Sequence, residues 1–164
     1  MELYQTERWH SDSFIYSLPL NESGHYVLVL KFSEVYFQKS GEKVFDVGLG
    51  KLRVIQNLDI FEKVGKASAH DEFIEFDLKD NKIFVKGDIE AEGAYDKKNK
   101  LIRVKFIKGS ADNPKINAIA IVKGNLMDTD YAEKKKILEE ARKKQLMKLK
   151  VISFLNLLYR NIYY

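Results

Sequence analysis

The stretch His25-Tyr26-Val27-Leu28-Val29-Leu30-Lys31-Phe32, followed at once by Ser33-Glu34-Val35-Tyr36-Phe37, decides the fold. Its first part is rich in β-branched and aromatic residues and is typical of a strand. Tyr36 and Phe37 are adjacent, and neighbouring residues of a regular strand point to opposite faces. Both rings can therefore be displayed together only where the strand ends or is bulged. The sequence thus predicts an aromatic pair at the rim of a sheet.

The same β-rich pattern continues to about Lys123, in short runs separated by turn residues. Eight such runs within roughly 120 residues indicate two packed antiparallel sheets, so we expect an all-β sandwich over residues 1–124. The predicted strands are Phe14–Leu18, Tyr26–Phe32, Lys43–Leu49, Lys51–Gln56, Asp71–Leu78, Lys82–Asp88, Leu101–Ile107 and Ile116–Val122.

Residues 125–164 have a different composition and are predicted to form a C-terminal α-helical extension. Asp130 and Glu133 have the spacing of a capping box, and no Pro or Gly follows Tyr131. The first half is basic, and the apolar run Val151–Tyr159 in the second half is nine residues long, too short to span a bilayer. Burial against a partner, against the sandwich or at a membrane surface are the alternatives. The helix residues expected to contact a protein partner are Lys143, Lys144, Val151, Phe154, Leu155 and Leu158.

Length and charge narrow the class of protein. The chain of 164 residues suits one domain with a tail, and zero cysteines exclude disulfides and thiolate metal sites. From Tyr131 to Tyr164 nine Lys and Arg oppose three Glu, a charge of +6, so the remaining 130 residues carry −2 of the total +4. A slightly acidic body argues against a nucleic-acid-binding fold. No signal segment opens the chain as written, so we expect a cytoplasmic location, or the lumen of the endoplasmic reticulum if an upstream signal precedes it.

Little in the sequence indicates catalysis, a metal or a cofactor. His10, His25 and His70 have no metal-ligand spacing, and no glycine loop precedes a helix to hold phosphate. In His70-Asp71-Glu72 only the first and third residues share a strand face, so we interpret this cluster as structural. We therefore expect a protein that is not an enzyme, with no cofactor and no metal.

Five ordered motifs carry a resemblance to a known family. They are Tyr4-Gln5-Thr6-Glu7-Arg8, Lys43-Val44-Phe45-Asp46-Val47, Asp59-Ile60-Phe61-Glu62-Lys63-Val64-Gly65, Ala69-His70-Asp71-Glu72 and Asp112-Asn113-Pro114-Lys115-Ile116. With the Tyr36-Phe37 pair, they make the chain similar to the malectin family of carbohydrate-binding domains from about Tyr4 to Gly124. The resemblance implies an antiparallel, jelly-roll-type sandwich.

The resemblance also implies a sugar site formed by Trp9, Tyr36, Phe37 and Asp112. Trp9 stands where the family usually has tyrosine, and the family draws a further tyrosine from a segment ahead of its Tyr-Gln-Thr-Glu-Arg motif. Aromatic rings at a sheet rim suit the C–H faces of sugar rings. Asp112 precedes Asn113-Pro114, so an Asx turn is a second explanation for it. We expect Glu7 and Arg8 to form an ion pair or a brace at the sheet end.

Two functions remain open from the sequence. The first is non-catalytic binding of a glucose-type oligosaccharide. The second is a scaffold or protein-interaction role in a larger assembly, possibly a cytoskeletal one, in which the C-terminal helix is the docking element. We favour sugar binding because exposed aromatics without a ligand are costly to retain.

Overall fold

A computed structural model describes residues 2–133, 135–137, 139–140, 143–144, 147 and 150–152. The chain divides into two compact units, Met1–Asn125 and Leu126–Tyr164. All strands of the described residues lie in the first unit.

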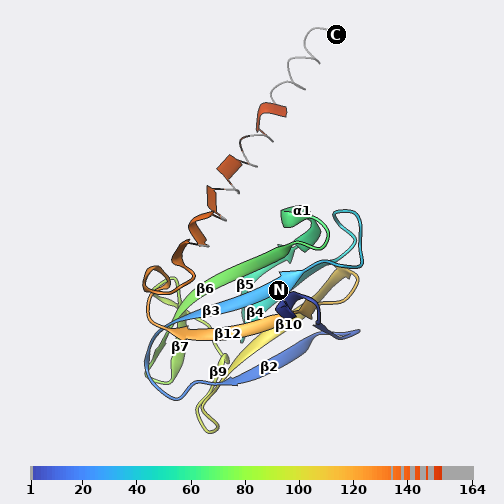
Figure 1. The fold of residues 1–164 in the computed structure, drawn as a ribbon. Coiled ribbons are helices and arrows are strands. Elements are labelled where there is room, and N and C mark those ends of the chain that lie inside the picture. The colour runs from blue at the N-terminus through green and yellow to red at the C-terminus, as the bar shows by residue number, and fades with distance from the viewer. Residues whose placement is uncertain are drawn as a thin grey trace, which may run out of the picture. The chain divides into compact units, whose positions relative to one another are not determined.

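The first unit is a β-sandwich whose two main sheets are antiparallel, which confirms the predicted fold class (Figure 1). One sheet has the order β2-β10-β4-β5, with β9 also pairing with β10, and the other has the order β12-β3-β6-β7-β8. A third, two-stranded sheet joins β1 to β11. The strands are β1 Arg8–Trp9, β2 Phe14–Pro19, β3 Gly24–Ser33, β4 Val44–Leu49, β5 Leu52–Leu58, β6 Ala69–Lys79, β7 Lys82–Val85, β8 Ile89–Glu90, β9 Tyr95–Asp96, β10 Leu101–Ala111, β11 Lys115–Ile116 and β12 Ala118–Lys123.

The core lies between the two main sheets. In β10, Ile102, Val104 and Phe106 are fully buried, whereas Arg103 between them is exposed, as alternation in a strand requires. The Phe106 ring stacks on Phe14 of β2 with 4.9 Å between centroids. The opposite sheet contributes buried side chains from β3 and β6, namely Leu28, Leu30, Phe32, Ile74, Phe76 and Leu78.

The last predicted strand, Ile116–Val122, is divided at Asn117. The Asn117 side chain accepts a hydrogen bond from the Ser33 N–H at 2.8 Å and donates one to the Thr6 carbonyl at 2.9 Å. These bonds hold the chain between β3 and the N-terminal segment. As a result, β11 pairs with β1 while β12 pairs with β3.

Several short elements of the described residues were not predicted: β1, β8, β9, helix α1 and the 3₁₀ turns Glu2–Tyr4 and Leu126–Asp128. β1 has only two residues, too few for a periodic signal. Helix α1, Ile60–Val64, begins at Asp59, whose side chain accepts the Glu62 N–H at 2.9 Å, and ends at Gly65 with φ of 78°. A capping aspartate and a glycine after the last turn are ordinary helix signals.

The second unit begins with a 3₁₀ turn, Leu126–Asp128, and its described positions from Ala132 to Ile152 are α-helical. Lys143, Lys144 and Val151 lie on this helix and are exposed. Phe154, Leu155 and Leu158 lie outside the described residues. Within the described residues, no helix combines the length and the apolar character needed to cross a membrane.

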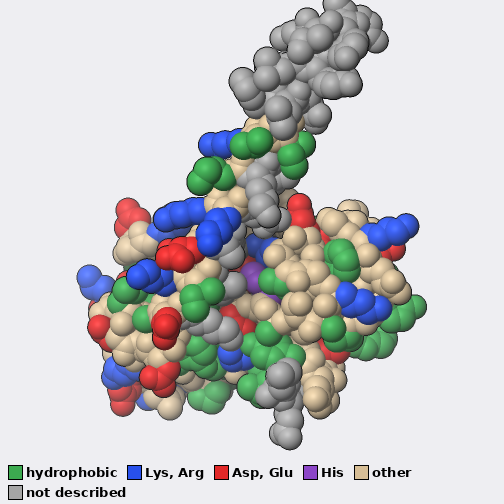
Figure 2. Space-filling view, turned by 45° about the horizontal axis from the view of Figure 1, so that its top comes forward, with side chains coloured by type: hydrophobic (Ala, Val, Ile, Leu, Met, Phe, Trp, Pro, Cys, Tyr) green, Lys and Arg blue, Asp and Glu red, His purple; other side chains and the backbone are tan. Residues whose placement is uncertain are grey.

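On the face drawn in Figure 2, acidic and basic side chains of the first unit are interspersed. This mixture agrees with the small net charge of the body in the sequence.

Candidate functional site

The four residues that the resemblance implied line one pocket. Trp9, Tyr36, Phe37 and Asp112 surround a cavity of about 360 Å³, together with Glu7, Lys43 and Asn113. These residues come from three separate parts of the chain, and the fold brings them to one place. The expected convergence of Tyr36 with Asp112 is therefore observed.

β1 positions the tryptophan. Trp9 pairs with Lys115 of β11, and its side chain is 57% exposed. Glu7 lies directly before β1 and two residues before Trp9, on the same side by strand alternation, and lines the same pocket. The segment Glu7–Trp9 thus supplies both a ring and a carboxylate to the cavity.

The aromatic pair lies beyond the end of β3, as the sequence predicts. Tyr36 is 77% exposed and Phe37 is half-buried, and the two rings meet edge to face with 5.0 Å between centroids and 87° between planes. Neither ring belongs to the sandwich core. Both rings are therefore available to line a surface pocket.

A buried carboxylate holds the backbone of this pair. Glu34 is 1% exposed, and its Oε1 accepts the N–H of Tyr36 at 2.8 Å and of Phe37 at 3.1 Å. Hydrogen bonds from backbone N–H groups to a carboxylate are among the stronger ones in proteins. Glu34 therefore fixes the point from which both rings project.

The rest of the β3–β4 loop is held in the same way. Glu42 accepts the N–H groups of Gln38 and Lys39 at 3.0 and 2.9 Å, and Asp59 accepts that of Gly41 at 2.6 Å. Acidic side chains thus bind the backbone N–H groups along the loop that carries the rings. Such a loop is pre-organised, so ligand binding need not order it.

Lys115 connects this loop to Glu7. The Lys115 side chain is 1% exposed, and its Nζ lies 2.7 Å from Glu7 Oε2 and 3.5 Å from Glu34 Oε2. A buried ammonium needs opposite charges around it, and the two carboxylates supply them. Glu7 therefore pairs with Lys115 and not with Arg8, so of the two expectations for Glu7, an ion pair with Arg8 or a brace at the sheet end, the structure favours the brace.

Asp112 is held by a second buried lysine. Lys43 is 8% exposed, and its Nζ lies 2.5 Å from Asp112 Oδ2, 2.8 Å from Asn113 Oδ1 and 3.0 Å from the Asn113 carbonyl. The same Nζ lies 5.5 Å from the Phe37 centroid. Asp112 has φ of 59°, a left-handed conformation that aspartate tolerates. In the described residues Asp112 accepts no backbone N–H, so the expected Asx turn is replaced by the bond to Lys43.

Glu34, Lys43 and Lys115 were missed as site residues. Glu34 and Lys43 directly precede an apolar or aromatic run, and Lys115 precedes the single apolar residue Ile116. Charges so placed in a sheet protein are exposed more often than buried, so sequence alone gives little signal.

The side chains of His70, Asp71 and Glu72 form hydrogen bonds and ion pairs with one another and with neighbouring residues, in agreement with the interpretation of this cluster as structural. His70 Nε2 lies 2.8 Å from Glu72 Oε1, while Asp71 pairs with Lys31 on β3 at 2.8 Å. Asp71 also accepts the Tyr4 hydroxyl at 2.6 Å. Among the described residues, no group of three or more His, Asp or Glu side chains could hold a metal ion.

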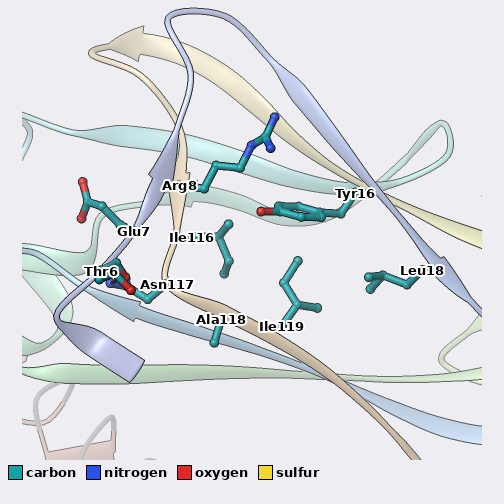
Figure 3. A pocket seen from close by; sticks show the side chains of 9 residues that line it. All are labelled: Thr6, Glu7, Arg8, Tyr16, Leu18, Ile116, Asn117, Ala118 and Ile119. Carbon is teal, nitrogen blue, oxygen red and sulfur yellow. Dashed lines mark hydrogen bonds between the residues drawn. The ribbon is translucent and has the colours of Figure 1, made fainter. Parts of the chain in front are cut away.

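A second cavity, of about 390 Å³, lies on the other side of β1 (Figure 3). There Arg8 projects over the rings of Phe14 and Tyr16, at 5.5 and 5.3 Å from their centroids. The wall also holds the polar residues Thr6, Glu7 and Asn117 and apolar side chains of β2, β11 and β12. Tyr16 is the one aromatic residue that lines this cavity, whereas three line the pocket around Tyr36, so the aromatic pocket is the stronger candidate for a ligand site.

The antiparallel sandwich has the architecture expected of a malectin-like domain. Comparison with known proteins identifies the family of the chain. Residues 1–119 match the family model described as Malectin domain, and the chain belongs to the malectin family.

The curated relatives support this membership. The chain is 46% identical over 126 residues to Malectin of Danio rerio and 44% identical over 126 residues to Malectin of Homo sapiens. These alignments cover 77% of this chain and 42% and 41% of the relatives, so the chain spans less than half of their length.

Solved structures show the same fold. The ANX1 ectodomain from Arabidopsis thaliana matches with a TM-score of 0.58 and 18% identity, over 76% of this chain and 33% of that one. A β-glucuronidase of Bacteroides uniformis matches with a TM-score of 0.51 and 18% identity, over 75% of this chain and 12% of that one. At these identities the likeness concerns the fold alone.

Proposed function

We propose that the pocket around Tyr36 binds a glucose-type oligosaccharide without catalysing its cleavage. One observation carries the proposal: an exposed aromatic pair, fixed by the buried carboxylate of Glu34, shares a pocket with Trp9 and Asp112. Rings that are exposed and yet rigidly held are poor core residues and good ligand platforms.

The chemistry of the pocket suits a sugar. The C–H faces of a glucopyranose ring pack on aromatic faces, and its hydroxyls need acceptors and donors beside them. Trp9, Tyr36 and Phe37 supply the faces, and Asp112 supplies acceptor oxygens at the edge.

The carboxylates of the pocket favour binding over hydrolysis. A glycosidase of the usual type needs one carboxylic acid that protonates the leaving oxygen. Glu7 and Asp112 each contact a lysine ammonium, at 2.7 and 2.5 Å, an arrangement in which a carboxylate acts as a hydrogen-bond acceptor. The proposed role is therefore that of a lectin-like module.

Calorimetric titration with maltose and other glucose disaccharides tests the proposal. A shallow, partly open pocket should bind a disaccharide weakly, with Kd on the order of tens of micromolar to millimolar. Tyr36→Ala should abolish measurable binding. Ile15→Ala, which removes a 51% exposed apolar side chain of β2, is the matched control and should bind as the unmodified protein does. Lack of binding by the unmodified protein at high sugar concentration would remove the proposal.

A second candidate function is supported by the helix of the second unit. Four of its described apolar side chains are more than half exposed: Ile137 at 60%, Met147 at 66%, Val151 at 57% and Ile152 at 54%. With Lys143 and Lys144 they would suit a protein partner that offers apolar and acidic groups. In that case the sandwich serves as a scaffold, and removing the helix abolishes partner recruitment.

A further inference from the structure

We propose that Glu7 is a second hydrogen-bonding carboxylate of the pocket, in addition to Asp112, and that the pair makes the site selective for neutral over acidic sugars. This inference rests on the proposed sugar-binding function. It adds a ligand residue and a substrate class that follow from how the two carboxylates are held.

The two carboxylates are held alike. Glu7 accepts a hydrogen bond from Lys115 through one oxygen, Oε2, and Asp112 accepts one from Lys43 through one oxygen, Oδ2. Both lysines are buried, whereas the carboxylate side chains are 25% and 32% exposed. Each acid thus has a fixed position and still reaches the cavity.

Both acids keep acceptor capacity for a ligand. An ionised carboxylate offers about four lone-pair sites. Within the part of the chain that the structure describes, Glu7 Oε1 accepts no hydrogen bond, and Asp112 Oδ1 accepts only the Asn113 side-chain amide at 3.1 Å. Sugar hydroxyls are donors as well as acceptors, so a ring lying on the aromatic residues can donate to both acids.

The lysines, in contrast, have no donor to offer a ligand. Lys43 makes three hydrogen bonds, which uses all three of its ammonium protons. Lys115 is fully buried between Glu7 and Glu34. The pocket therefore presents acceptor oxygens to a ligand but no accessible cation.

An acidic sugar is disfavoured by this charge pattern. The ion pairs that support the pocket contain three carboxylates and two lysines, which leaves one negative charge in excess. They are Glu7, Glu34 and Asp112 with Lys43 and Lys115. A uronic acid would bring its own carboxylate next to Glu7 and Asp112, and no free ammonium is there to receive it. Like charges placed together without a counter-charge oppose binding.

Calorimetry with a matched pair of sugars tests the inference. The probes are maltose and the disaccharide in which its non-reducing glucose is replaced by glucuronic acid, each titrated at pH 7. The unmodified protein should bind maltose at least about tenfold more tightly than the acidic sugar. Glu7→Gln should weaken maltose binding about five- to tenfold, the difference between a hydrogen bond to a charged acceptor and one to a neutral acceptor. It should reduce the ratio of maltose affinity to acidic-sugar affinity by a similar factor.

Controls separate the possible results. Glu92→Gln alters a 68% exposed carboxylate outside the pocket and should leave both affinities unchanged. Near-ultraviolet circular dichroism and thermal melting check that Glu7→Gln is folded, and Glu7→Asp, which keeps the charge, should retain the preference for maltose. Maltose binding with equal affinity for the acidic sugar, or with no effect of Glu7→Gln, would overturn this inference and leave the proposed function standing. Absence of binding to either sugar would remove both.

Discussion

Replacing Glu34 by alanine should both destabilise the protein and disable the pocket. Glu34 accepts two backbone N–H bonds and lies 3.5 Å from buried Lys115. Hydrogen bonds to a charged group contribute about 1.5–3 kcal/mol each, and removal of one partner of a buried ion pair costs about 3–5 kcal/mol. These contributions overlap, so we expect the free energy of unfolding to fall by about 3–5 kcal/mol.

Urea unfolding at pH 7, followed by circular dichroism, measures this loss, and maltose titration measures the loss of binding. Glu92→Ala is the control, because Glu92 is 68% exposed and its ion pair with Lys51 should contribute less than about 1 kcal/mol.

A variant with both Glu34→Gln and Lys115→Met keeps an acceptor for the two N–H groups and removes the buried charge. It should recover part of the stability lost in Glu34→Ala. A loss below about 1 kcal/mol in Glu34→Ala, with unchanged maltose affinity, would refute the assigned role of Glu34.

Three further predictions follow from other parts of the structure. The hydrogen bond between His25 and Asp77, at 2.8 Å, raises the pKa of His25 above 6.5, so protonated His25 stabilises the fold at low pH and this stabilisation is lost as the pH rises through the raised pKa. In thermal melting, His25→Gln should lower the melting temperature more at pH 5.5 than at pH 8, and an equal decrease at both pH values would contradict this. In Gly109→Ala the new Cβ would lie 2.2 Å from the Val44 carbonyl oxygen, which should push β10 away from β4 and lower the melting temperature; Gly109 does not have a left-handed φ, so the cost comes from this contact and not from backbone strain, and an unchanged melting temperature would contradict it. Deleting Val151–Tyr164 should leave the fold of the first unit intact by circular dichroism, and unfolding of the shortened chain would mean that the helix belongs to the core.

The sequence predicts those features whose signal is local. The strand predicted at Tyr26–Phe32 is visible in consecutive apolar residues, and β3 extends it only by two residues at the start and one at the end. The projection of Tyr36 and Phe37 follows from their adjacency at a strand end. The sandwich follows from the number of β-rich runs and the turns between them.

The support of the pocket depends on contacts between distant residues and could not be predicted in this way. Lys115 meets Glu34 only because β11 lies beside β1 and the end of β3, and Lys43 meets Asp112 across 69 positions in the chain. Asn117 divides the last strand through its bonds to Ser33 and Thr6, which no local pattern in the sequence indicates. Tertiary packing, which decides whether a charged side chain is buried, is absent from the linear pattern.

Quenching of tryptophan fluorescence tests the central claim most directly, because Trp9 is the single tryptophan of the chain and lines the proposed sugar pocket. Its side chain is 57% exposed, so acrylamide should quench its emission readily in the free protein. Added maltose should cover the indole and reduce the quenching constant along a saturable curve, with Kd on the order of tens of micromolar to millimolar. In Asp112→Ala the same curve should shift to higher sugar concentration. A quenching constant that stays the same at every maltose concentration would contradict sugar binding at this pocket.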